Sequence, residues 1–128
     1  MMITAVAAIL LAALAAFQLA LALGAPLGDM AWGGKYPGVL PMRLRVASAV
    51  AGLVIYPVIA AVVLAAGGII SDDWVPLDIA VVLWVLVAFF AIGAVVNALS
   101  RSPRERIWSP VSAGLAIFCA LLALGPAA

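Results

Sequence analysis

The sequence predicts an all-α membrane protein: a four-transmembrane-helix bundle with both termini outside and a structured, Gly/Pro-rich first cytoplasmic loop. Three observations support this expectation. Of the 128 residues, 70% are hydrophobic and 9% are charged, whereas soluble domains are roughly half apolar and about a quarter charged. Four apolar segments reach the length of a membrane span, and every Lys and Arg lies near two of the three connections. We expect one domain, residues 1–128.

The helices follow from the length of the apolar segments. A membrane-spanning helix needs about 20 mainly apolar residues, and the chain offers such segments at residues 3–23, 45–67, 77–99 and 107–124. The alternative for the first segment is a cleaved signal peptide. Two features oppose it, because no Lys or Arg precedes the run and the run exceeds the ~7–15 apolar residues of a signal peptide.

The orientation follows from the charges of the connections. The second connection, residues 68–76, carries Asp72 and Asp73 and no cation. All cations lie in or beside the first and third connections: Lys35, Arg43, Arg45, Arg101, Arg104 and Arg106. Because Lys and Arg accumulate in cytoplasmic loops, we expect these two connections in the cytoplasm and both termini outside.

Small residues predict where helices pack, because lipid favours interfaces with close backbone approach. They recur every four residues in the first segment, at Ala8, Ala12, Ala16, Ala20 and Gly24. Shorter sets occur in the other segments: Ser48 and Gly52, Gly93, and Ser112, Ala116 and Ala120. We expect these faces to pack within the bundle. The alternative is a homo-oligomer interface on one of them.

Pro57 interrupts the second segment near its middle. Proline removes a backbone donor and should kink the helix or loosen a turn. The neighbouring Tyr56 brings a hydroxyl to membrane depth, either as a packing residue or as a ligand contact.

The first connection, residues 24–44, is long for a helical bundle, where about 2–8 residues are usual. It combines glycines and prolines with Trp32, Tyr36 and Leu40, unlike a flexible polar linker. We expect a folded cap that lies at the interface or dips into the bundle.

Candidate ligand- or lipid-binding residues gather near the cytoplasmic end: Gln18, Asp29, Trp32, Lys35, Arg43, Arg45, Tyr56, Asn97 and Arg101. The arginines could bracket an anionic lipid headgroup or serve only to set topology. Gln18 and Asn97 are functional candidates as polar groups inside the membrane, with an interhelical hydrogen bond as the alternative. Glu105 is expected to pair with a neighbouring arginine, and Asp29 with Lys35 or an arginine.

The residue inventory excludes several chemistries. One cysteine and no histidine leave no CxxC site, no usual zinc site and no histidine-dependent triad. We expect no catalytic residues, metal or cofactor. A net charge of +1 does not favour nucleic acid as a partner.

Three functions remain open. The first is a non-enzymatic accessory, scaffold or anionic-lipid-binding protein, whose partners are membrane lipid, another protein or a second copy of the chain. The alternative is a small transporter or channel for a neutral or anionic solute. An enzyme that modifies lipids ranks last, because Asp29 and Glu105 are the only carboxylates at the cytoplasmic end.

Two sequence signatures resemble those of a family of small, uncharacterised bacterial four-helix integral membrane proteins. The first connection reads GAPLG at 24–28, WGGK at 32–35 and LPMRLRVAS at 40–48. The second signature lies around the third connection and consists of Asn97, SRSPRER at 100–106 and PV at 110–111. The resemblance covers the whole chain and implies the fold and a location in a bacterial inner (cytoplasmic) membrane, without implying a chemistry.

Overall fold

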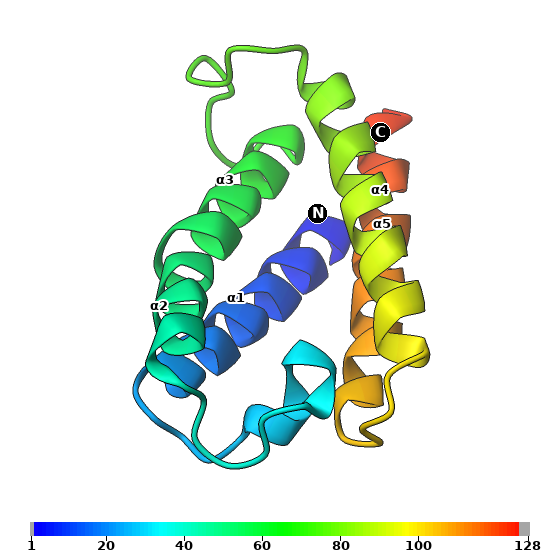
Figure 1. Ribbon diagram of the computed structural model, residues 1–128. Helices are drawn as coiled ribbons and strands as arrows, with labels where there is room; N and C mark the ends of the chain where they lie inside the picture. The colour runs from blue at the N-terminus through cyan, green and yellow to red at the C-terminus, as the bar shows by residue number, and fades with distance from the viewer. Residues whose placement is uncertain (1, 126–128) are drawn as a thin grey trace.

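The computed structural model describes residues 2–125, which form a bundle of four long helical spans (Figure 1). The first span is α1 (Met2–Ala22). The second consists of α2 (Met42–Val50), a π-helical turn (Ala51–Ile55) and α3 (Tyr56–Ala66). The third is α4 (Ile79–Ala98), and the fourth is α5 (Trp108–Ala123), preceded by one 3₁₀ turn (Glu105–Ile107). All four are long and apolar enough to cross a membrane, as in a multi-pass membrane protein. Their ends lie within three residues of the predicted bounds.

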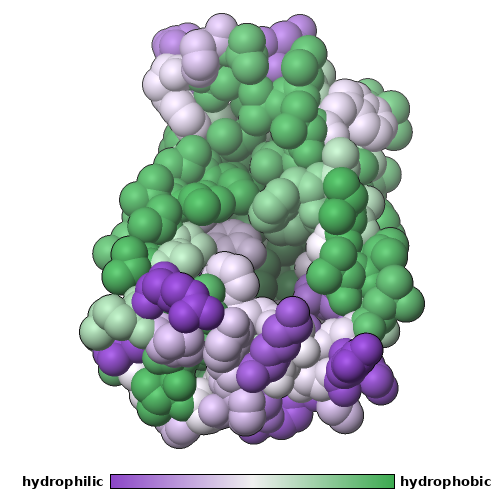
Figure 2. Space-filling view, in the orientation of Figure 1, coloured by the Kyte–Doolittle hydropathy of each residue, from purple (hydrophilic) through white to green (hydrophobic). Residues whose placement is uncertain are grey.

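Successive spans run in opposite directions (Figure 1). The start of α1 and the end of α5 lie on the same side as the connection between α3 and α4. The other two connections, residues 23–41 and 99–104, lie together at the opposite side, which we call the basic end because all the Lys and Arg residues lie in or beside them. In Figure 2 hydrophilic residues gather at this end, below a surface that is mostly hydrophobic.

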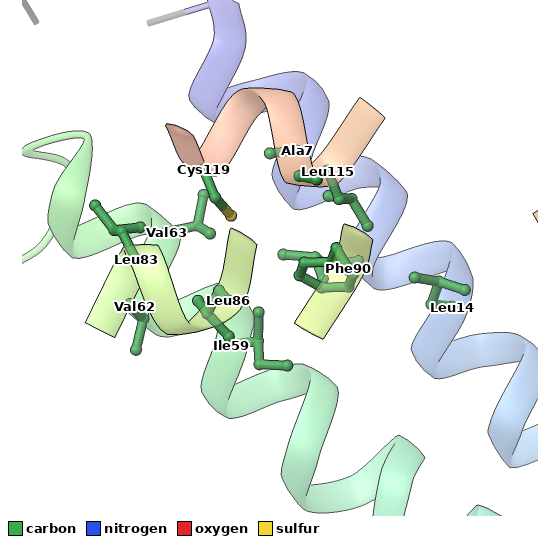
Figure 3. Close-up of a cluster of buried hydrophobic side chains, with 12 residues drawn as sticks. Ala7, Leu14, Ile59, Val62, Val63, Leu83, Leu86, Phe90, Leu115 and Cys119 are labelled. Atoms are coloured by element: carbon green, nitrogen blue, oxygen red, sulfur yellow. The ribbon is translucent and has the colours of Figure 1, made fainter. Parts of the chain in front are cut away.

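The main hydrophobic core fills the half of the bundle away from the basic end. Leu11, Leu83 and Leu115 come from three different spans and are at most 1% exposed. Val63 from α3 and Cys119 from α5 complete the contact between all four spans (Figure 3). Large side chains therefore fill the space between the helices in this half of the bundle.

The expected small-residue packing face of α1 forms only in part, with Ala8, Ala20 and Gly24 half-buried. Ala12 and Ala16 are exposed, and the buried residues of α1 are Thr4, Ala7, Leu11, Leu14 and Leu21. At a close contact between the second span and α1 the small residue belongs to the partner helix, since a Cβ on Gly52 would lie 2.8 Å from Leu19 Cγ and 2.9 Å from the Ala15 carbonyl oxygen. Large side chains of α1 therefore pack against a glycine opposite them.

The small residues of the other spans pack as expected. Ser48 and Gly52 are buried in the second span. Ser112 and Ala116 are buried in α5, and Gly93 of α4 faces Ser112. The homo-oligomer interface stays a prediction.

Candidate ligand-binding cavity

A cavity of about 430 Å³ lies at the basic end, with walls from α1, α3, α4 and α5 and from residues 30–32. A second cavity of about 260 Å³ adjoins it, since five residues line both: Tyr56, Phe89, Val96, Asn97 and Ser112. Together they form what we call the basic-end cavity. Figure 2 shows the molecule hollowed between the hydrophobic helices and the hydrophilic basic end. Ligand pockets commonly measure about 300–1,000 Å³.

The wall of the basic-end cavity is mainly aromatic and aliphatic. Its aromatic residues are Phe17, Trp32, Tyr56, Phe89, Phe90 and Trp108. The rings of Phe17 and Trp108 pack with their centroids 4.7 Å apart. Only four polar residues join them in the larger cavity: Gln18, Asn97, Glu105 and Ser112. An apolar wall with a few polar groups is typical of a site for a small organic molecule.

A widened helical turn positions Tyr56. The residues before it, Ala51–Ile55, form a π-helical turn, and the Tyr56 N–H donates to the Ala51 carbonyl oxygen five residues earlier. The next residue, Pro57, has no N–H to donate to Leu53. The predicted loosening of this helix is thus confirmed, and π turns are frequent at functional sites. Half-buried Tyr56 lines both parts of the basic-end cavity.

The first connection forms the floor of the cavity. Residues 24–41, which we call the cap, contain two short 3₁₀ turns, Gly28–Met30 and Trp32–Gly34. Trp32 has a φ of 54°, which is rare for a residue with a side chain and marks a candidate functional position. Ala31 and Leu40 of the cap are buried against Leu21 of α1.

The cap is attached to the third connection. The Arg104 guanidinium forms an ion pair with Asp29 at 3.0 Å, which confirms the expected pairing of Asp29 with an arginine. The Ser102 hydroxyl donates to the Asp29 carbonyl oxygen. Gly34 lies directly against the Ser102 side chain, where an added Cβ would come within 2.5 Å. These contacts hold residues 30–32 beneath the cavity.

Glu105 lines the cavity and is 6% exposed. Its Oε2 accepts a hydrogen bond of 3.1 Å from the Gly33 N–H, and its Oε1 is buried without a partner. The expected pairing with an arginine is not present, because Arg104 binds Asp29 and Arg106 donates to the Ser100 carbonyl oxygen at 2.8 Å. Among the described residues no cation lies within 4.0 Å of this carboxylate.

Two more residues of the cavity wall have buried polar atoms without a hydrogen-bond partner, Gln18 at Oε1 and Trp108 at Nε1. The remaining such side-chain atom in the described chain is the hydroxyl of Ser48. Native proteins rarely leave buried polar atoms unpaired. The expected interhelical hydrogen bond of Gln18 or Asn97 is not present in residues 2–125. A bound molecule would give these atoms partners.

The structure brings together Gln18, Trp32, Tyr56 and Asn97 of the nine predicted site residues. The rest lie outside the cavity wall: Asp29, Lys35, Arg43, Arg45 and Arg101. Asp29 lies at the contact between the cap and the third connection. Lys35 and Arg101 are exposed.

Two predicted arginines are engaged by the protein. Arg43 donates to the Tyr36 hydroxyl at 2.9 Å and lies over that ring, 5.6 Å from its centroid. Arg45 donates to the Ala22 carbonyl oxygen at 3.0 Å. Like Arg104 and Arg106, they donate hydrogen bonds to acceptors in the cap, in the third connection or at the end of α1.

Sequence reasoning missed much of the wall: Phe17, Met30, Phe89, Glu105 as a cavity residue, Trp108 and Ser112. A usable signal was helical spacing. Glu105, Trp108 and Ser112 lie three and four residues apart, a spacing that puts side chains on one helix face. Phe17 and Gln18 similarly follow Leu14 on one face of α1.

Comparison with protein-family models, with curated proteins and with solved structures gives no match to this chain. The resemblance of its loop signatures therefore stays a prediction, and its function has to be inferred from the geometry of the basic-end cavity.

Proposed function

We propose that this protein is a non-enzymatic membrane protein that binds one lipid molecule in the basic-end cavity. The observation that supports the proposal is the combination of an open, aromatic wall with three buried polar atoms that lack a hydrogen-bond partner: Gln18 Oε1, Glu105 Oε1 and Trp108 Nε1. Each such atom costs about 1–3 kcal/mol when it is left unpaired. A molecule with both apolar and polar parts satisfies this wall.

The position of the cavity suits a lipid. Three of its four exposed wall residues, Phe89, Ile92 and Val96, lie on α4, a helix long and apolar enough to span the membrane. Its floor is the cap at the basic end. A lipid lying alongside the bundle would place its polar group near the cap and its chains along α4. By the distribution of Lys and Arg, we propose that this end is cytoplasmic, in a bacterial inner membrane.

The hydrophobic core supports binding rather than passage of a solute. Val63, Leu115 and Cys119 are fully buried in the half of the bundle beyond the cavity. A molecule entering at the basic end would meet these packed side chains, because protein interiors are close-packed. The cavity therefore resembles a blind pocket more than a channel.

The engagement of the arginines changes the role proposed for the basic residues. Arg43, Arg45 and Arg104 donate to acceptors within the protein. We propose that they hold the cap in place, and that the cavity is the lipid site. Lys35 and Arg101 remain exposed to contact anionic headgroups at the membrane surface.

Native mass spectrometry of the gently extracted protein tests this proposal. We expect one lipid per chain. Val96 lines both parts of the cavity and is 60% exposed, so Val96→Trp should fill the cavity without disturbing the core. Val95 is 58% exposed and lies outside the cavity wall, which makes Val95→Trp the matched control.

We expect Val96→Trp to lose the lipid and Val95→Trp to keep it. Retention by both variants would place the lipid elsewhere. A wild-type chain that carries no lipid, and takes up none when lipid is added, would refute the proposed function.

A further inference from the structure

The buried Glu105 carboxylate lacks a matching positive charge. It is 6% exposed, and the cationic side chains on either side of it bind Asp29 and the Ser100 carbonyl oxygen. A buried carboxylate is costly unless it is paired and hydrogen-bonded. The Gly33 N–H satisfies Oε2 alone. A group that both carries positive charge and donates a hydrogen bond to Oε1 would match this carboxylate.

The surrounding wall fits such a group. Five aromatic residues line the larger part of the cavity with Glu105: Phe17, Trp32, Tyr56, Phe89 and Trp108. Aromatic faces attract cations, and the attraction strengthens where water is excluded. In contrast, an anionic headgroup here would meet a like charge in a poorly solvated place. A hydroxyl would satisfy the hydrogen bond and leave the charge unmatched.

We infer that the basic-end cavity recognises a protonated amine, and that this amine is the headgroup of an ethanolamine-type phospholipid. One N–H of the amine donates to Glu105 Oε1, and the aromatic residues surround the charge. This inference rests on the proposed lipid-binding function and specifies the headgroup. The cap takes part in recognition, because the Gly33 N–H holds the carboxylate through its other oxygen.

The test measures the binding of lipid to delipidated protein in a non-ionic detergent. Tryptophan fluorescence reports the binding, because Trp32 and Trp108 line the cavity. Glu105→Gln keeps an oxygen for the Gly33 N–H and removes the charge. Asp72→Asn, an exposed position on the connection between α3 and α4, removes the same charge away from the cavity and is the control. The ligands are dioleoyl phosphatidylethanolamine and dioleoyl phosphatidylglycerol.

We expect Glu105→Gln to bind the ethanolamine lipid about tenfold more weakly, as for the loss of one hydrogen bond to a charged group. Its binding of the glycerol lipid should stay unchanged, and Asp72→Asn should behave as wild type. Equal effects on both lipids, or no effect, would overturn the amine inference and leave the proposed lipid binding intact. Binding of neither lipid by the wild type would overturn both.

Two measurements on the wild-type protein make the result independent of the folding of Glu105→Gln. N-acetylation of the ethanolamine lipid removes its positive charge and should weaken binding by a similar factor, and unchanged affinity would overturn the inference. Free ethanolamine distinguishes the source of the amine. If it displaces no lipid at concentrations well above that of the lipid, the ligand is the phospholipid. Full displacement at concentrations equal to that of the lipid would show that the amine alone supplies the affinity, which supports the amine site and overturns the phospholipid as its preferred ligand.

Discussion

The contact between Gly52 and α1 gives a stability prediction that can be worked from the structure. A Cβ at Gly52 would lie 2.9 Å from the Ala15 carbonyl oxygen and 2.8 Å from Leu19 Cγ. Ordinary contact begins at 3.4 Å, so the two helices must separate by about 0.5 Å or lose contacts elsewhere. Overpacking of this kind costs about 1–3 kcal/mol, and alanine returns up to about 1 kcal/mol in helix propensity.

We therefore expect Gly52→Ala to lower the free energy of unfolding by up to about 2 kcal/mol. Gly114 of α5 is the matched control, because a Cβ there meets nothing within 4 Å. Gly114→Ala should gain only the helix propensity, about 1 kcal/mol at most. The difference between the two variants, about 1–3 kcal/mol, isolates the cost of the helix contact.

Cys119 provides the assay. It is the single cysteine of the chain and is fully buried in the core, so a thiol-reactive fluorophore labels it only when the bundle opens. Labelling during a temperature ramp or an SDS titration gives the unfolding midpoint. We expect midpoints in the order Gly114→Ala, wild type, Gly52→Ala, from most to least stable. A Gly52→Ala midpoint equal to or above that of Gly114→Ala would refute the close contact of the second span with α1.

Three further predictions concern the cap and the orientation. Gly28→Ala would push a Cβ onto backbone carbonyl oxygens of the cap, so trypsin should cleave after Lys35 faster than in wild type, and an unchanged rate would contradict the cap fold. Asp29→Asn breaks an exposed ion pair and should cost less than about 1 kcal/mol, with the difference from wild type disappearing at high salt; a larger cost would mean that the pair is a main support of the cap. In a Cys119→Ser background, a thiol reagent that does not cross membranes should label Lys35→Cys and Asp72→Cys from opposite sides, and labelling from the same side would refute the four-span topology.

The spans and their polarity could be predicted from the sequence because they depend on short stretches of chain. About 20 apolar residues predict a span wherever they occur, and the observed ends differ from the predicted ones by at most three residues. Pro57 acts on its own turn, so the widened turn before Tyr56 was also predictable. Gln18, Tyr56 and Asn97 were predicted because polar side chains stand out in an apolar segment.

Glu105 and Trp108 were not predicted as neighbours in one site, since their roles depend on contacts far along the chain. Glu105 binds the Gly33 N–H, 72 residues away. Its expected arginine partner was taken by Asp29, 75 residues from Arg104. Competition between several cations and few carboxylates cannot be read from adjacent positions.

By itself the sequence determined that this chain forms four apolar helices and gathers its cations at one end. Only the tertiary structure decided which helix faces meet. The exposed Ala12 and Ala16 of α1 and its buried Ala7 are equally apolar, because lipid on one side and protein on the other favour similar residues. Hydropathy therefore does not distinguish the inner face of a helix from its lipid-facing side. Shape complementarity positions the helices, through contacts such as that of Gly52 with α1, and this packing leaves the cavity between them.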